Sequence, residues 1–252
     1  TSSLEHARKL ARAAIAAGET AVAFGGDGII SAVAEALRHT DSLLGVLPGG
    51  RGNDFARTLG IPLDPCQACD VLAHGAVREL DLATVNAKTF IGIASCGFDS
   101  DANRIANETR IVRGNLVYAY GALRALVAWE PAAFEVTLDG HQRRAFSGYS
   151  VAAANSKAYG GGMLLAPGAS LQDGLLDVVM VAFLPKRRFL RLLPTVYRGA
   201  HIKQANVEVL RASEIEVSAD RPFTMYADGD PIAELPVKIK ALPRAVRVLV
   251  PE

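Results

Sequence analysis

Two glycine-rich segments that contain carboxylates are the places where this chain could bind phosphate. In the first, Gly25, Gly26, Asp27 and Gly28 follow the apolar run 21–24 and precede a helix-like stretch. Glycine has no Cβ, so its backbone can approach a phosphate closely, and the first N–H groups of a helix carry a partial positive charge. Asp27 could hold a magnesium ion or orient a phosphate, although these residues would also suit an ordinary tight turn.

The second segment, residues 48–57, follows the next predicted strand. It offers Arg51, which could neutralise phosphate oxygens, and the pair Asn53 and Asp54 at a helix start. Asp54 could reach a metal ion, or the pair could simply cap the helix. Because the carboxyl ends of parallel strands meet at one edge of a sheet, the two segments together predict a nucleotide-phosphate site.

A third candidate lies near the C-terminus, where Asp228, Gly229 and Asp230 precede Pro231. Taken alone, this sequence is typical of a β-turn. Beside a phosphate site, one of its carboxylates could accept the proton of a hydroxyl that is being phosphorylated. Both readings depend on which elements bring the three segments together.

The first third of the chain alternates helix and strand patterns, which predicts a parallel sheet covered by helices. Strand patterns then dominate and favour an antiparallel β-sandwich. We therefore expect an α/β nucleotide-binding domain over residues 1–80 and a β-rich domain over 81–252, whose last strand could pair with either domain. The predicted helices are 3–17, 28–39, 53–59, 65–74, 99–109 and 114–128. The predicted strands are 20–24, 43–47, 77–85, 89–97, 134–138, 144–154, 175–183, 206–211, 213–218, 222–227, 234–241 and 244–250.

Composition narrows the class of protein. The net charge of +1 argues against a general binder of nucleic acids, and no apolar run has the length of a membrane span. No segment of this sequence has the pattern of a signal peptide, and three cysteines do not make a disulfide framework, so we expect a cytoplasmic protein. Cys66 and Cys69 are predicted to lie one turn apart on a helix as buried thiols. The chain opens on a helix, so we expect the first strand of the α/β sheet to be missing.

Five segments in a fixed order resemble the motifs of the diacylglycerol kinase catalytic family, specifically its soluble bacterial lipid kinases. They are Gly-Gly-Asp-Gly at 25–28, Pro-Gly-Gly-Arg-Gly-Asn-Asp-Phe-Ala-Arg at 48–57, Tyr-Gly-Gly-Gly-Met at 159–163, Asp-Gly-Leu-Leu-Asp at 173–177 and Asp-Gly-Asp at 228–230. The resemblance spans essentially the whole chain. It implies an ATP-dependent kinase that acts on a lipid hydroxyl, first of all that of diacylglycerol, in a cleft between an α/β domain and a β-rich domain.

The resemblance also implies roles for individual residues. Asp230 would be the general base, beside Asp228, and a structural Mg²⁺ would be held by Ser170, Asp173 and Leu175, although residues 173–174 could also form a plain turn. The implied nucleotide contacts are Thr1, Gly25, Gly26, Asp27, Gly28, Ile29, Ile30, Ser31, Arg51, Asn53 and Asp54. The chain departs from the family pattern at Ile29 and Arg51, which replace threonines, at Ser31, which replaces an asparagine, and at Asp230, which replaces a glutamate.

Two other functions stay open. An NAD kinase has a related fold and glycine loop, and the departures from the pattern would also suit a catalytically impaired protein that only binds lipid or nucleotide. A lipid kinase must meet its substrate at a membrane surface, and the basic amphipathic stretch 186–203 could lie on anionic headgroups or be a solvated helix. The family resemblance further implies a possible homodimer.

Overall fold

Local capping signals set the ends of the helices in the first part of the chain. The computed structural model describes residues 1–109 and 116–252. In it, α1 (Leu4–Ala17) begins after Ser3, whose hydroxyl accepts a hydrogen bond from the His6 N–H, and ends at Gly18 in the left-handed conformation. α4 (Pro65–His74) begins after Asp64, whose carboxylate caps it in the same way. These helices lie where the sequence predicts them.

A small parallel sheet ends at the glycine segments. β1 (Ala21–Gly25) and β2 (Leu43–Pro48) pair in parallel, with Gly25 opposite Pro48. α2 (Asp27–Leu37) follows the first strand and α3 (Asp54–Leu59) follows the second. Both glycine segments therefore lie at the same edge of the sheet.

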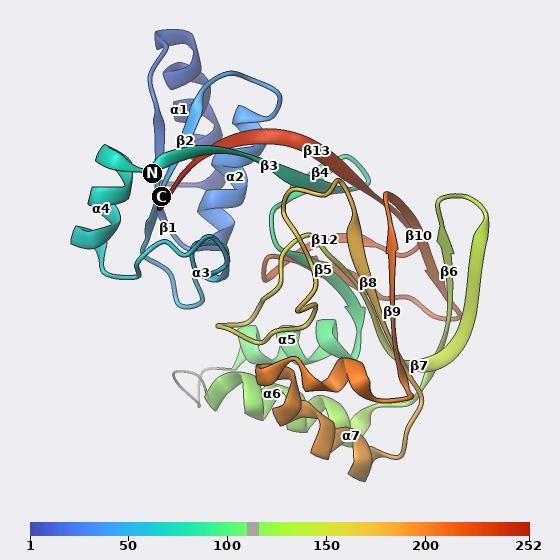
Figure 1. The fold of residues 1–252 in the computed structure, drawn as a ribbon. Helices are drawn as coiled ribbons and strands as arrows, with labels where there is room; N and C mark the ends of the chain where they lie inside the picture. Colours follow the sequence, from blue (N-terminus) through green and yellow to red (C-terminus); the bar gives the residue numbers. More distant parts are fainter. Residues whose placement is uncertain (110–115) are drawn as a thin grey trace.

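Two long strands run through both domains. β3 (Ala76–Val85) and β13 (Val237–Val250) are antiparallel neighbours along most of their length, and in Figure 1 they arch from one domain to the other. The start of β13 pairs with β10 (Glu214–Ala219), and its end pairs in parallel with β2. The last residues of the chain thus complete the sheet of the first domain.

The remaining strands form the antiparallel second domain, with helices packed at one end (Figure 1). Its core includes the aromatic rings of Phe98, Trp129, Tyr149 and Phe189, of which Tyr149 and Phe189 stack with their centroids 3.9 Å apart. The expected combination of an α/β domain and a β-sandwich-like domain is confirmed.

The other elements are β4 (Lys88–Phe90), β5 (Ile93–Gly97), α5 (Phe98–Glu108), α6 (Leu116–Ala128), β6 (Ala132–Leu138), β7 (Gln142–Ala154), β8 (Leu176–Ala182), α7 (Lys186–Leu192), η1 (Leu193–Arg198), η2 (Ala200–Lys203), β9 (Val207–Ala212), β11 (Thr224–Ala227) and β12 (Asp230–Glu234).

The structure corrects several sequence predictions. The predicted strand 89–97 is two strands, β4 and β5, interrupted at residues 91–92, and the two predicted C-terminal strands are one strand with a bulge between Leu242 and Val246. The sequence pattern does not predict β12. Residues 114–115 of the predicted helix 114–128 lie outside the described residues.

The cysteine prediction is half right. Cys66 and Cys69 do lie one turn apart on α4, but both are exposed, because the helix packs through Ala68 and Val71 instead. Among the described residues, no helix is both long enough and apolar enough to cross a membrane.

Candidate active site

The two glycine segments touch each other through their backbones. A Cβ on Gly50 would lie only 2.4 Å from the Cα of Gly26, which is far inside van der Waals contact. The Gly49 N–H also donates to the Gly25 carbonyl at 2.9 Å. Only glycine permits this approach, so the pair forms a tight cradle whose surface is backbone rather than side chain.

Asn53 shapes the second glycine segment. Its side-chain oxygen accepts a hydrogen bond from the Gly50 N–H at 2.8 Å, and its amide donates to the Gly50 carbonyl at 2.9 Å. The residue adopts the left-handed conformation and makes no capping bond to α3. The alternative in which the Asn53 side chain caps α3 does not hold, because that side chain bonds backward to the loop.

Asp27 caps α3 instead. Its two carboxylate oxygens accept hydrogen bonds from the N–H groups of Asp54 and Phe55, at 3.1 and 3.0 Å. The carboxylate of Asp54 in turn accepts from the N–H groups of Gly161 and Gly162, at 2.9 and 2.7 Å. This chain of bonds ties the first domain to the glycine loop 160–162 of the second. The alternative in which Asp54 caps α3 does not hold, because Asp27 occupies that role.

The charge of Asp54 is affected by this position. Burial raises the pKa of Asp54, and the neighbouring Asp27 charge adds to that effect, whereas the two glycine N–H groups lower the pKa. The negative charge of Asp54 is therefore stabilised by the N–H groups of Gly161 and Gly162. Loss of the contact with the glycine loop would leave two negative charges close together.

Asp228 and Asp230 occupy different environments despite their spacing. The carboxylate of Asp228 accepts hydrogen bonds from the N–H groups of Ile91 and Gly92, at 2.9 and 2.8 Å, and from the hydroxyl of Ser31. Burial raises the pKa of Asp228 to about 7, although the two N–H groups oppose the shift. The break between β4 and β5 is thus the place where two backbone N–H groups become available to this carboxylate.

Asp230 is exposed at the first position of β12, and its carboxylate makes no hydrogen bond or ion pair with any residue that the structure describes. One of its oxygens would lie 3.3 Å from a Cβ placed on Gly28, so the carboxylate faces the start of α2. Asp228 holds the backbone in place, whereas Asp230 presents an unengaged carboxylate at the glycine cradle.

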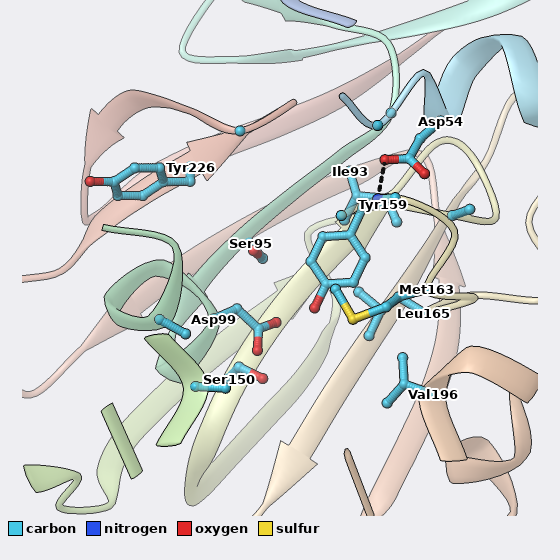
Figure 2. Close-up of a pocket in the computed structure, with 18 of the residues that line it drawn as sticks. Asp54, Ile93, Ser95, Asp99, Ser150, Tyr159, Met163, Leu165, Val196 and Tyr226 are labelled. Carbon is cyan, nitrogen blue, oxygen red and sulfur yellow. Dashed lines mark hydrogen bonds between the residues drawn. The ribbon is translucent and has the colours of Figure 1, made fainter. Parts of the chain in front are cut away.

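A single cavity of about 820 Å³ connects these groups with the second domain. Its polar end is lined by Asp27, Arg51, Asp54, Asp228 and Asp230. Beyond Tyr159 the lining becomes mainly apolar and includes Phe98, Leu165, Phe189 and Val196. Figure 2 shows part of this interior, with Tyr159 beneath the bond that joins Asp54 to the glycine loop.

Other predicted nucleotide contacts lie in the same region or beside it. Arg51 is exposed at the cavity, and Ser31 contacts Asp228. Ile29 packs against Gly25, and the Ile30 side chain is fully buried, so only backbone atoms of Ile30 could face a ligand. Thr1 is exposed before α1 and is not among the residues that line the cavity.

The predicted metal residues lie on one turn, but their contacts are those of a structural turn. The Asp173 carboxylate accepts from the Leu175 N–H at 3.1 Å and lies 3.8 Å from Nη1 of Arg211, and the Ser170 hydroxyl accepts from the Gln172 N–H. Within residues 1–109 and 116–252, no group of three His, Cys, Asp or Glu side chains could hold a metal. The predicted Mg²⁺ site uses one carboxylate and two backbone carbonyls rather than three such side chains, so it stays a prediction.

Two residues that organise this region were not predicted. Asp81 is 1% exposed, and its carboxylate accepts from the N–H groups of Gly174 and Arg244, both at 2.7 Å. The buried amide of Asn155 donates to the carbonyls of Asp81 and Ile91. A polar residue inside the apolar run 80–85 and another directly after the run 151–154 were the available signal, because a buried polar side chain needs partners.

The polar end of the cavity fits the phosphates of a nucleotide. The glycine contact leaves backbone exposed where any Cβ would intrude. Gly26 precedes α2 and offers it no side-chain cap, so the first N–H groups of the helix can meet an anion. A magnesium ion that accompanies phosphates needs only one or two protein carboxylates and keeps its waters. The carboxylates of the four aspartates at this end could provide such ligands.

Comparisons with known proteins agree with this architecture. A sequence profile of the diacylglycerol kinase catalytic domain matches residues 1–85, and one of the YegS C-terminal NAD kinase beta sandwich-like domain matches residues 92–250. Diacylglycerol kinases of Mycobacterium tuberculosis H37Rv and Bacillus subtilis 168 are 37% and 31% identical, over 97% and 98% of this chain and 81% and 82% of theirs. A solved structure of a candidate diacylglycerol kinase from Bacillus anthracis has the same fold, with a TM-score of 0.83 at 20% identity over 99% of this chain and 82% of that one.

The two profiles together span both domains, and the two bacterial relatives align with nearly the whole chain at identities above 30%. The resemblance drawn from the five motifs is confirmed. The chain belongs to the diacylglycerol kinase family and is a lipid kinase.

Proposed function

We propose that this lipid kinase transfers the γ-phosphoryl group of ATP to the free hydroxyl of diacylglycerol. The observation that carries the proposal is the continuity of one cavity, which has a glycine cradle and four carboxylates at one end and an apolar interior at the other. Such a cavity suits a substrate with a reactive polar head and an apolar tail, held beside a phosphate donor.

The chain's own residues can perform the step. The lipid hydroxyl oxygen forms the new bond to phosphorus while the bond to the bridging oxygen breaks and ADP leaves. Asp230 accepts the hydroxyl proton, because its carboxylate is unengaged and lies at the cradle. The start of α2 and the Arg51 guanidinium would neutralise phosphate charge, and Mg²⁺ bound with ATP would supply further charge neutralisation.

Label transfer from ATP to dioctanoylglycerol tests this function in the intact chain. We expect labelled phosphatidic acid from the wild type and a loss of at least a hundredfold in Asp230→Asn, which removes the proton acceptor but keeps the shape. Asp70→Asn, at an exposed aspartate on α4 away from the cavity, is the matched control and should be fully active. Label in NADP when NAD is supplied, or none in any lipid, would refute the proposal.

Exposed apolar side chains suggest how the enzyme reaches a membrane. Leu123 and Val127 on α6, Phe183 before α7, Leu190 on α7 and Tyr197 on η1 are 48% to 74% exposed. Lys186 donates from α7 to the Val127 carbonyl at 2.9 Å, so the two helices lie together. Because Leu123, Leu190 and Tyr197 also line the cavity, this patch surrounds its apolar end.

The charge around the patch is of one sign. Residues 178–207 contain no aspartate or glutamate, and the cations in this stretch are all exposed: Lys186, Arg187, Arg188, Arg191, Arg198 and Lys203. Each cation near an anionic bilayer contributes about 1 kcal/mol of binding. We therefore propose that this face docks on anionic lipid and that the substrate enters the cavity there.

Co-sedimentation with vesicles that contain 30% phosphatidylserine separates this face from the rest of the surface. Reversing two charges, Arg187→Glu with Arg191→Glu, should weaken partitioning at least tenfold, whereas Lys9→Glu with Arg12→Glu on α1 should not. Equal partitioning of the two double variants would mean that the face is simply a solvated surface.

A further inference from the structure

A carboxyl group interrupts the apolar interior of the cavity. Asp99, the second residue of α5, lies partly buried among apolar lining residues, and the hydroxyl of Ser150 on β7 is hydrogen-bonded to it. In Figure 2 the Asp99 carboxyl points into the cavity beside Ser150. Burial of such a group costs free energy unless it is hydrogen-bonded, so its presence here needs an explanation.

The fold does not provide that explanation. The capping of α5 is done by Ser100, whose hydroxyl accepts from the Gly97 N–H at 3.1 Å and donates to the Gly97 carbonyl at 2.8 Å. No cation of the described residues lies within ion-pair distance of Asp99. Ser150 provides one hydrogen bond to a group that has room for several.

Tyr159 marks where Asp99 lies along the cavity. The ring of Tyr159 lies between Asp54 and Asp99 in Figure 2, and the charges of both carboxylates act on its hydroxyl. The bonds from Gly161 and Gly162 to Asp54 hold this segment in place. Asp99 therefore lies on the other side of Tyr159 from Asp54, where the apolar lining of the cavity begins.

A polar group between the phosphate end and the apolar interior matches the structure of a glycerolipid. In diacylglycerol, the carbonyl of the neighbouring acyl ester is only a few bonds from the free hydroxyl, and the acyl chains begin just beyond it. An ester carbonyl has lone pairs but no donor, so a protein group that binds it must donate a hydrogen bond.

We propose that Asp99, in its neutral form and supported by Ser150, donates a hydrogen bond to the acyl ester next to the hydroxyl that is phosphorylated. This subsite would select ester-linked lipids, and it deepens the proposed function, on which it rests. Burial raises the pKa of Asp99 to about 6. An acyl chain that displaces water from the cavity would favour the neutral carboxyl further, while the Ser150 hydroxyl donates to its other oxygen.

A matched pair of lipids tests the subsite, namely dioctanoylglycerol and its dioctyl ether, which lacks the carbonyl. One hydrogen bond of about 1 kcal/mol predicts that the wild type favours the ester by about five- to tenfold in kcat/KM. Asp99→Leu should bring this ratio close to one. It should fold, because leucine has a branched shape similar to that of aspartate and would join the apolar residues that line this part of the cavity. Asp99→Asn, whose amide still donates, should keep most of the preference.

Binding measured without catalysis separates this proposal from the proposed function. Trp129 is the only tryptophan of the chain, and its ring lies 5.8 Å from that of Phe98, which lines the cavity. Its fluorescence can report the dissociation constants of both lipids in the wild type and in the two Asp99 variants. An ester preference that Asp99→Leu removes would support the subsite even if no phosphate were transferred.

Three results would overturn the subsite. Equal binding of ester and ether by the wild type would show that no donor meets the carbonyl. An equal loss for both lipids in Asp99→Leu would show a structural role for the carboxyl. A wild-type preference for monooctanoylglycerol over dioctanoylglycerol that Asp99→Leu abolishes would show that Asp99 accepts a hydrogen bond from a hydroxyl instead.

Discussion

Adding one methyl group to Gly50 should disable the site while leaving the fold intact. The new Cβ of Gly50→Ala would lie 2.4 Å from the Cα of Gly26 and 3.0 Å from the side-chain oxygen of Asn53. Ordinary contacts begin near 3.4 Å, so the two glycine loops must separate by about 1 Å. Overpacking of this kind costs about 1–3 kcal/mol of stability.

The catalytic cost should be larger than the stability cost suggests. A displacement of about 1 Å in a positioned group lowers rates on the order of a hundredfold. Both glycine loops form the cradle, so their displacement changes the positions of the backbone groups that would bind the nucleotide phosphates. We therefore expect kcat/KM for ATP to fall about a hundredfold, while the Kd for dioctanoylglycerol, measured by Trp129 fluorescence, changes less than twofold.

The control is a glycine that carries a similar cost elsewhere. Gly140, in the hairpin turn between β6 and β7, has a φ of +72°, and no atom lies within 4 Å of the position that a Cβ would take there. Gly140→Ala should cost about 1–2 kcal/mol through its left-handed backbone and leave the kinetics unchanged. Initial rates over a range of ATP concentrations give kcat/KM for both variants, and thermal melts give their stabilities. An unchanged kcat/KM in Gly50→Ala would refute the assignment of the cradle to ATP.

Three further outcomes follow from the described contacts. Asp54→Asn keeps only one acceptor oxygen for the glycine loop 160–162, so proteolysis in that loop should quicken and kcat/KM for the lipid should fall about tenfold, which limited digestion and initial rates will show. Arg211→Met removes the partner of the buried Asp177 carboxylate, which accepts its Nε–H at 2.9 Å, and should lower the free energy of urea unfolding by about 1–3 kcal/mol. The pKa of Asp99 is raised in the folded state, which therefore binds its proton more tightly than the unfolded chain, so stability should fall as pH rises from about 4 to about 6. Asp99→Asn should remove at most roughly 3 kcal/mol of that fall, measured by urea unfolding at several pH values.

The pieces that could be predicted from the sequence are those governed by neighbouring residues. Helix α4 begins at a proline behind a capping aspartate and ends before a glycine, and each of these signals lies within a few residues of the end it sets. The glycine segments at β1 and β2 were likewise recognisable, because strand, glycines and helix follow one another directly. The class of fold followed from the order of such pieces.

The contacts of the site could not be predicted because their partners are distant in the chain. Asp54 bonds to glycines 107 and 108 residues later, and nothing near Asp54 indicates them. The break between β4 and β5 lies inside an apolar run that reads as one strand, yet it is what frees the N–H groups of Ile91 and Gly92 for Asp228. Asp99 gives no signal in the sequence because a helix start already explains an aspartate there.

The pair Asp228 and Asp230 shows why motif and geometry carry different information. The spacing predicts two carboxylates at one site but does not indicate how their environments differ. In the folded chain, both carboxylate oxygens of Asp228 accept hydrogen bonds from backbone N–H groups 136 and 137 residues earlier, so the geometry commits this carboxylate to holding the backbone. Asp230 is exposed and unengaged among the described residues. The shorter side chain at the base position therefore matters less than the motif alone suggests, because β12 itself brings Asp230 to the start of α2, where a carboxylate oxygen already faces Gly28.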